Sequence, residues 1–216
     1  MKRDFDKVAV SWDDDPRRVQ LAGDLARTIM REAELTREMD LLEFGCGTGL
    51  ISLHLQPHVR SLLGVDSSAG MLDVFRGKLK ERGITNVSAT FLDPLKYTKI
   101  DGSFHLVVSG MTMHHIADVG SLFKEFHSIL LPGGKVCIAD LDTEDGSFHS
   151  DKTGVEHFGF DRLKMAAMLG SAGFGGIRDV TAATIIMDAN NRKKREYSVF
   201  LMIARKEAAK ILDGVG

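Results

Sequence analysis

Cysteine, proline and long apolar runs are scarce in this sequence. Its 216 residues include only 2 cysteines, Cys46 and Cys137, and 4 prolines. Two cysteines are too few for a disulfide scaffold, and without a Cys-x-x-Cys motif they do not predict a zinc site. No apolar stretch approaches the roughly 20 residues of a membrane-spanning helix, and residues 1–7 lack the apolar run of a secretory signal. We therefore expect a cytoplasmic protein with no membrane partner.

A large excess of charge is also lacking. The 28 Lys and Arg residues against 30 Asp and Glu residues give a formal net charge of −2. Such a balance gives no electrostatic reason to expect nucleic acid as a partner. The hydrophobic fraction of 44% and the charged fraction of 27% are typical of a globular protein. Because no repeat or linker divides the chain, we predict a single domain over residues 1–216.

From residue 39 onwards, short apolar runs alternate with helical segments, and this alternation predicts a parallel sheet covered on both faces. Residues 1–38 carry helical spacing, with Pro16 at a first-turn position and an acidic loop before it at residues 11–15. Two β-rich runs near the end, joined by residues 188–191, predict a hairpin. The expected strands are 39–44, 61–65, 86–91, 104–109, 135–141, 177–187 and 197–205, and the expected helices are 50–55, 71–82, 119–130 and 161–172. The fold class is thus a doubly wound, Rossmann-like α/β sheet with a mixed edge and a C-terminal antiparallel hairpin.

A glycine-rich loop lies between the first predicted strand and the first core helix. Residues 43–49 read Glu-Phe-Gly-Cys-Gly-Thr-Gly, and glycines there allow a ligand to approach the backbone closely. Leu50 stands where the dinucleotide motif G-x-G-x-x-G needs its third glycine, and a Gly-Lys-Ser/Thr phosphate loop is absent. Glu43 would repel a pyrophosphate but suits a cationic ligand. The simpler interpretation of the loop alone is a tight turn.

Two acidic residues follow the next two predicted strands. Asp66 lies 21 positions after Gly45, and Asp93 follows the third strand. Ligands of open α/β sheets bind outside the carboxyl ends of the strands, where one carboxylate can accept both ribose hydroxyls and another an adenine amino group. Each aspartate alone is more often a helix cap or turn residue. The ordered combination with the loop predicts an adenosine-containing cofactor.

These motifs together resemble the class I S-adenosylmethionine-dependent methyltransferases of the small-molecule type. The matching segments are 42–49, 64–68 with Met71, then Asp93, 104–109 and 131–135, and the resemblance runs from about residue 39 to residue 205. It implies a seven-stranded sheet whose last strand is antiparallel. It also implies that the N-terminal segment, residues 1–38, closes over the cofactor, chiefly through residues 5–18.

The resemblance further implies a cofactor, S-adenosylmethionine, and a set of residues that hold it. The glycine loop would admit the methionine part of the cofactor, and Asp66 would hold the ribose. Ser67 and Met71 would border the adenine, Asp93 would bind its amino group, and Ser109 would contact the amino group of the methionine part. The implied cofactor-binding residues are Glu43, Gly45, Cys46, Gly47, Asp66, Ser67, Met71, Asp93 and Ser109. The family has no fixed catalytic residue.

Candidate catalytic residues therefore come from the chain itself. His114 follows the fourth predicted strand, and His157 lies in the polar stretch after the fifth, so either can serve as a proton-transfer group in the crevice. The alternative for each is a structural histidine that hydrogen-bonds a carbonyl group or caps a helix. No helical His or carboxylate spacing supports a metal site, so none is predicted. Trp12 is either a lid over the crevice or a packing residue.

The predicted function is methyl transfer from S-adenosylmethionine to a small-molecule acceptor whose identity the sequence leaves open. One alternative is a non-catalytic protein of the same fold that binds S-adenosylmethionine or S-adenosylhomocysteine. A nicotinamide-dependent oxidoreductase is a third interpretation, and Leu50 and Glu43 count against it.

Overall fold

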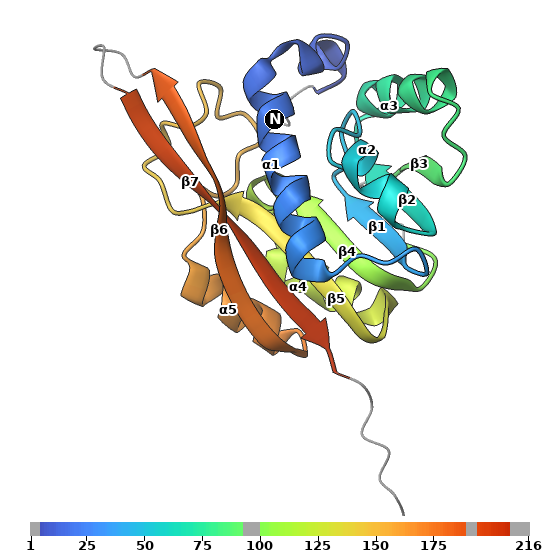
Figure 1. Cartoon of the computed structure of the whole chain (residues 1–216). Helices are drawn as coiled ribbons and strands as arrows, with labels where there is room; N and C mark the ends of the chain where they lie inside the picture. Colours follow the sequence, from blue (N-terminus) through green and yellow to red (C-terminus); the bar gives the residue numbers. More distant parts are fainter. Residues whose placement is uncertain (1–4, 93–99, 189–193, 208–216) are drawn as a thin grey trace, which may run out of the picture.

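A computed structural model describes residues 5–92, 100–188 and 194–207, and these residues form one seven-stranded mixed sheet with helices on both faces (Figure 1). The strands are β1 (Asp40–Phe44), β2 (Ser61–Asp66), β3 (Val87–Phe91), β4 (Phe104–Gly110), β5 (Leu130–Leu141), β6 (Phe174–Asp188) and β7 (Lys194–Lys206). The helices are α1 (Pro16–Ala33), α2 (Ser52–Leu55), α3 (Ala69–Glu81), α4 (Val119–Ile129) and α5 (Arg162–Ser171). Four short 3-10 helices, η1 (Asp6–Val8), η2 (Trp12–Asp14), η3 (Gln56–His58) and η4 (Met113–His115), complete the described secondary structure.

The strand order is β3-β2-β1-β4-β5-β7-β6. Strands β1 to β5 pair in parallel, whereas β7 pairs antiparallel with both β5 and β6. The predicted doubly wound sheet and its antiparallel last strand are therefore confirmed. The chain builds outward from β1 to β3 and then returns to place β4 on the other side of β1. This reversal makes the carboxyl ends of β1 and β4 the topological switch point, where open α/β sheets bind ligands.

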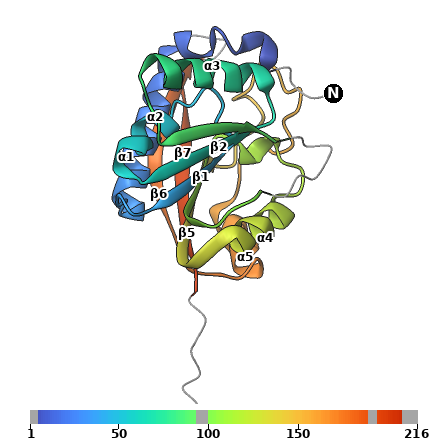
Figure 2. The same ribbon diagram turned by 90° about the vertical axis from the view of Figure 1, so that its right-hand side faces the viewer.

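Successive side chains along the strands pack alternately into two hydrophobic layers, one on each face of the sheet. Leu41 of β1 packs with α1 and α2, whereas its neighbour Leu42 packs with α4 and α5 on the opposite face. This division follows from the period of two along a strand. Figure 2 shows the sheet between these two pairs of helices. Phe123 and Phe126 of α4 are fully buried, and burial of each stabilises the fold by roughly 1.5–3 kcal/mol.

The N-terminal segment, residues 5–15, lies at the edge of the sheet where β1 and β2 end, next to α3 (Figure 1). Pro16 occupies the first turn of α1, as the sequence predicts, and Asp15 caps the helix by accepting a hydrogen bond of 3.0 Å from the N–H of Arg17. The acidic run before Pro16 differs from the predicted loop, because Trp12–Asp14 form one turn of 3-10 helix. Within the described part of the chain, no helix is long and apolar enough to cross a membrane.

Strand β5 begins earlier than the sequence predicts. Leu130 already pairs with Phe104 of β4, and the register then shifts before Leu106 pairs with Lys135. The Pro-Gly-Gly run at 132–134 therefore forms an irregularity within the strand instead of a separate turn. Asp93 and most of the predicted hairpin turn lie outside the described residues.

Candidate functional site

The glycine-rich loop follows β1 directly at the switch point. Gly45 and Gly47 both have positive φ angles, 73° and 52°, a backbone conformation that other residues rarely adopt. A Cβ atom at Gly45 would lie only 2.3 Å from Oγ1 of Thr112, which follows β4. At Gly47, by contrast, a Cβ atom would meet nothing within 4 Å. The chain therefore packs against Gly45, whereas Gly47 faces open space that a ligand can occupy.

Asp66 ends β2 and ties the glycine loop to the start of α3. Its carboxylate accepts a hydrogen bond of 2.7 Å from the N–H of Gly47 and another of 2.9 Å from the N–H of Ser68. Burial raises the pKa of Asp66, and the backbone hydrogen bonds from Gly47, Ser68 and Ser67 oppose that rise. The predicted placement of Asp66 beside the loop is thus what the structure shows.

Glu43 lies beneath the loop, not at its surface. Its side chain is buried and accepts a hydrogen bond from the hydroxyl of Ser52 in α2. Burial raises the pKa of Glu43 to about 8, with the nearby Asp66 adding to the rise. Near neutral pH this carboxyl group is therefore mostly protonated, which differs from the fixed negative charge that the sequence pattern indicates.

The remaining predicted cofactor residues surround the same edge of the sheet. Met71 is buried in α3, and Ser67 is exposed immediately after β2. Ser109 is buried, and its hydroxyl donates a 2.8 Å hydrogen bond to the carbonyl oxygen of Phe44, joining β4 to β1. Cys46 is buried within the loop, and burial raises the pKa of its thiol well above the usual range. Asp93 lies outside the described residues.

The N-terminal segment is clasped to both sides of this site. Asp13 accepts a hydrogen bond of 2.6 Å from the hydroxyl of Thr48 in the glycine loop and forms an ion pair with Lys78 of α3. Lys78 also donates a hydrogen bond of 2.8 Å to the carbonyl oxygen of Thr48. Asp6 accepts hydrogen bonds from the hydroxyl of Ser68 and, at 2.8 Å, from the N–H of Gly70. We call these contacts of Asp6 and Asp13 the N-terminal clasp.

Trp12 packs within the N-terminal segment itself. The guanidinium of Arg18 lies 3.8 Å from the centre of the indole ring, and the ring of Phe5 meets it edge-on with 5.9 Å between centroids. Phe5 also packs edge-on against the ring of His115, with 5.3 Å between centroids. The contact of Phe5 links the N-terminal segment to His115, which follows β4.

His114 is held by a buried carboxylate. Its Nδ1 lies 2.8 Å from Oδ1 of Asp140, and its backbone N–H donates a 3.2 Å hydrogen bond to Oδ2 of the same residue. His114 is 2% exposed and Asp140 is 0% exposed. Met111, with a positive φ of 55°, turns the chain out of β4 so that η4 and His114 meet β5. A polar pair so completely removed from water is costly to bury.

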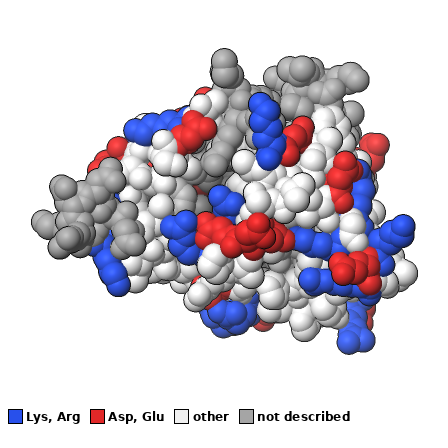
Figure 3. All heavy atoms as spheres, turned by 90° about the horizontal axis from the view of Figure 1, so that it is seen from above, with Lys and Arg blue, Asp and Glu red and all other residues white. Residues whose placement is uncertain are grey.

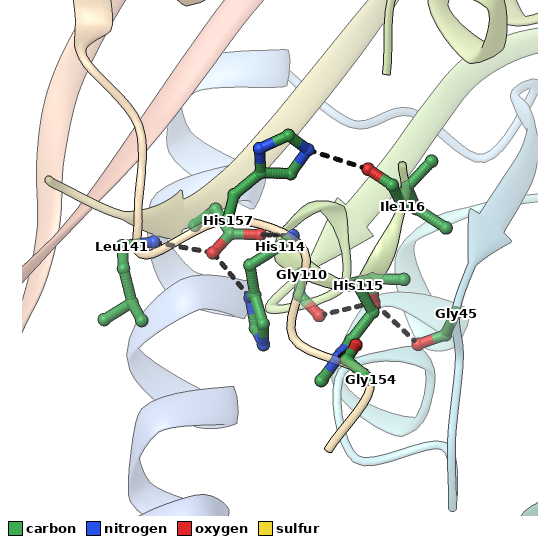
Figure 4. A network of polar contacts seen from close by, with 10 residues as sticks. Gly45, Gly110, His114, His115, Ile116, Leu141, Gly154 and His157 are labelled. Carbon is green, nitrogen blue, oxygen red and sulfur yellow. Dashed lines mark hydrogen bonds and ion pairs between the residues drawn. The ribbon is translucent and has the colours of Figure 1, made fainter. Parts of the chain in front are cut away.

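His157 makes a different contact. Its Nε2 lies 2.9 Å from the carbonyl oxygen of Ile116, and its ring packs on Phe160 with 5.0 Å between centroids. Figure 4 shows the rings of His114 and His157 pointing away from one another. The two predicted catalytic histidines are therefore neighbours in space, but their imidazoles do not face one another.

His115 and His149 stack on His114 and form a histidine cluster with it. The ring centroids of His114 lie 4.2 Å from His115 and 4.9 Å from His149, and those of His115 and His149 lie 5.9 Å apart. His115 Nδ1 also lies 2.7 Å from the carbonyl oxygen of Gly154. Within the described ranges, no three His, Cys, Asp or Glu side chains are arranged to hold a metal ion.

Asp140 and His149 are site residues that the sequence patterns do not identify. A signal for Asp140 exists, since it is the single acidic residue in the apolar run of β5. His149 lies in a polar loop with no regular pattern, so its approach to His114 depends on tertiary structure alone.

Comparisons with known proteins match the part of the chain that contains the glycine-rich loop and Asp66. A family model described as a methyltransferase domain matches residues 41–134, which span β1 to the middle of β5. An uncharacterized methyltransferase of Schizosaccharomyces pombe is 36% identical over 136 residues, covering 56% of this chain and 48% of that protein. A demethylmenaquinone methyltransferase of Lactococcus lactis is 32% identical over 117 residues, covering 52% of this chain and 46% of that protein. The matches thus span about half the length of these relatives.

A solved structure extends the likeness over more of the fold. Phosphoethanolamine N-methyltransferase 2 of Haemonchus contortus, in complex with S-adenosyl-L-methionine, superposes with a TM-score of 0.69. The superposition covers 84% of this chain and 52% of that one at 18% sequence identity. At such low identity, the likeness establishes the shared fold.

Proposed function

Because the chain belongs to the class I S-adenosylmethionine-dependent methyltransferases, we propose that it transfers the methyl group of this cofactor to a small-molecule acceptor. The observation that carries the proposal is the link between Asp66 and Gly47 at the switch point of the sheet. There a carboxylate and open space at a glycine come together. This arrangement fits a cofactor with a ribose diol and an extended methionine chain.

The residues at this edge match the parts of the cofactor in order. Gly47 would admit the methionine part, with Gly45 packed against Thr112 beside it, and Asp66 would accept hydrogen bonds from the ribose hydroxyls. Ser67 and Met71 would border the adenine, since they lie just beyond Asp66 along the chain. Ser109 would contribute its backbone carbonyl to the amino group, because its hydroxyl already donates to Phe44. Cys46 would contribute backbone groups only, because its side chain is buried.

Glu43 contributes through its charge. A positive charge close to a carboxyl group lowers the pKa of that group. A bound sulfonium and ammonium near the loop would therefore bring the pKa of Glu43 down from about 8, and the carboxyl group would release its proton near neutral pH. On the face seen from above in Figure 3, the acidic side chains near the centre have Lys and Arg side chains beside them. The response of Glu43 to a nearby positive charge is therefore the feature that favours a cationic cofactor over an anionic one.

When bound, S-adenosylmethionine supplies an activated methyl group on a positively charged sulfur. The chain's own contribution is alignment and exclusion of water. The N-terminal clasp joins Thr48 of the glycine loop to the start of α3 through Asp13 and Asp6. The clasp would cover the cofactor after binding. The acceptor would then enter from the other side of the site, where the histidine cluster lies.

The names of related proteins support a small-molecule acceptor. One relative acts on demethylmenaquinone and a structural neighbour on phosphoethanolamine, both small molecules. Met111, which follows β4, and Phe148, in the loop after β5, are partly buried against the same apolar cluster and would form an apolar side of the acceptor site. A non-catalytic, cofactor-binding protein has no observation in its favour.

Calorimetric titration with S-adenosylhomocysteine tests the cofactor site. The Asp66→Ala variant should bind roughly 10- to 100-fold more weakly, because hydrogen bonds to a charged group contribute about 1.5–3 kcal/mol. Asp73→Ala is the matched control, since Asp73 is exposed in α3 and contacts Arg76 only through an exposed ion pair. A folded wild-type protein that binds no S-adenosylhomocysteine at millimolar concentration would contradict the proposal. Transfer of tritium from methyl-labelled S-adenosylmethionine into small molecules of a cell extract then tests the reaction.

A further inference from the structure

We propose that His114 is the base that takes a proton from the acceptor, with Asp140 as its positioning residue. The acceptor then belongs to the class that loses a proton on methylation near neutral pH, such as a hydroxyl group or an amine. This inference rests on the proposed methyl transfer and names the substrate class for the same site.

The contacts of Asp140 determine the tautomer of His114. An ionised carboxylate only accepts hydrogen bonds. Oδ1 of Asp140 lies 2.8 Å from Nδ1 of His114 and also accepts a 2.8 Å hydrogen bond from the N–H of Leu141. With Asp140 ionised and His114 neutral, Nδ1 carries the proton, which leaves Nε2 with a lone pair. A neutral imidazole in this tautomer is a proton acceptor at Nε2.

Burial makes a purely structural role a poor explanation. A buried ionic or polar pair contributes no more stability than apolar residues of similar volume, and often less. Asp140 and His114 nevertheless lie almost fully out of water between β4 and β5, where apolar side chains otherwise fill the layers. His157 lacks such a partner, because its Nε2 meets a backbone carbonyl group. The pair is thus the arrangement expected of a base oriented by a carboxylate.

The pair also lies beside the proposed cofactor. Thr112, two residues before His114, donates a 3.4 Å hydrogen bond to the carbonyl oxygen of Gly45. Half-buried His115 and His149 stack on His114 and separate it from solvent. An acceptor entering on this side displaces one of the two rings by a side-chain rotation and so reaches Nε2.

Other ionisable groups surround His114. Asp140 faces it from β5, His115 from its own turn, and His149 from the loop after β5. Glu156 and His157 approach through their backbone N–H groups, both of which donate to the carbonyl oxygen of His114. Substitutions at these neighbouring groups are therefore needed to distinguish their effect on a pH profile from the effect of His114.

The proposed step balances atoms and charge. The bond between the methyl carbon and the sulfur breaks, and its electron pair stays on the sulfur, which becomes a neutral thioether. A lone pair of the acceptor atom forms the new bond to the methyl carbon. The proton of that acceptor atom passes to Nε2 of His114, which becomes an imidazolium stabilised by Asp140.

Nitrogen NMR of the protein labelled with ¹⁵N-histidine tests the tautomer without any acceptor. In the complex with S-adenosylhomocysteine, we expect His114 to carry its proton on Nδ1 and none on Nε2. The Asp140→Asn variant should shift the proton to Nε2, because the asparagine amide can donate to Nδ1. A wild-type His114 protonated on Nε2 alone would overturn the inference even if the cofactor binds. Loss of cofactor binding by the wild-type protein would instead defeat the proposed function.

The rate at which tritium passes from methyl-labelled S-adenosylmethionine to the small molecule that accepts it in the cell extract tests the base directly. His114→Asn keeps a donor where Nδ1 lies but removes Nε2, so it should fold and bind S-adenosylhomocysteine normally. Its transfer rate should fall about 10²- to 10⁴-fold, the range for loss of a general base, and should recover as pH rises and the acceptor ionises unaided. His58→Gln, at an exposed position of η3, is the control. A wild-type rate in His114→Asn at every pH, or a product that is a sulfonium or quaternary ammonium ion, would overturn the inference.

Discussion

The carboxylate of Asp66 accepts a 2.7 Å hydrogen bond from the backbone N–H of Gly47, so the end of β2 holds the loop that follows β1. The same carboxylate accepts a hydrogen bond from the N–H of Ser68 at the start of α3. Two strand ends and one helix are therefore fixed relative to each other before any ligand arrives. Preorganisation of this kind lowers the entropic cost of binding.

Alanine substitutions at Gly45 and Gly47 should separate packing from ligand access. Gly45→Ala places a methyl group 2.3 Å from the hydroxyl oxygen of Thr112, so we expect it to lower the free energy of unfolding by several kcal/mol. Gly47→Ala meets no atom within 4 Å, and its positive φ should cost only about 1–2 kcal/mol. Its methyl group, however, enters the space proposed for the cofactor. Urea unfolding and calorimetric titration with S-adenosylhomocysteine check both effects. Equal loss of affinity in a folded Gly45→Ala protein would contradict this division.

The N-terminal clasp should control how fast the cofactor leaves. Asp13→Ala removes the contacts to Thr48 and Lys78, and we expect the dissociation rate of S-adenosylhomocysteine to rise about 10-fold, since one charge-assisted hydrogen bond contributes about 1.5 kcal/mol or more. Asp14→Ala is the matched control, because Asp14 is an exposed neighbour in the same turn. Trp12 is the single tryptophan of the chain, so stopped-flow fluorescence reports on this segment. An unchanged dissociation rate in Asp13→Ala would show that the clasp does not limit release.

Arg162 should determine how firmly the loop after β5 is held. Its guanidinium donates to both carboxylate oxygens of Asp142, at 2.7 and 2.6 Å, and to Asp179 and Thr181 on β6. These contacts join the start of α5 to the end of β5, and the residues between them include His149. We expect Arg162→Ala to speed backbone hydrogen exchange in residues 143–160 by local unfolding, whereas exposed Lys164→Ala should not. Unchanged exchange in this loop would assign its stability to other contacts.

Most of the fold could be predicted because it depends on local patterns. Periods of two and 3.6 located the strands and helices, and Pro16 correctly located the start of α1. The early start of β5 was not predictable, since Leu130 pairs with Phe104 only through a register shift that tertiary packing selects. The position of Asp66 beside the glycine loop followed from parallel strands ending at one edge.

The histidine cluster shows where the sequence was insufficient. His114 was identified from its place after β4, but its partner Asp140 lies 26 residues away on the next strand. His149 comes from an irregular loop, so only the folded chain brings it to His114. The state of Glu43 also escaped prediction, because a pKa depends on burial and not on the residue type.

The buried carboxyl group of Glu43 should give the stability of the protein a distinctive pH dependence. Its pKa rises on folding from the ordinary value of 4.5 to about 8, so the folded protein holds a proton that the unfolded chain has lost. The contribution of Glu43 to the free energy of unfolding is therefore largest below pH 4.5 and decreases as pH rises towards 8. The slope approaches about 1.4 kcal/mol per pH unit for one proton.

Glu43→Gln removes this titration while keeping a group that hydrogen-bonds to Ser52. We expect the variant to match the wild-type protein near pH 5 and to exceed its stability above pH 7, as measured by urea unfolding across this range. Because cofactor binding favours the ionised carboxyl group, the wild-type protein should also release protons on binding S-adenosylmethionine near pH 7. The variant should release fewer, which calorimetry in buffers of different ionisation enthalpy detects. Parallel pH profiles of stability for the two proteins would mean that Glu43 stays ionised in the folded state.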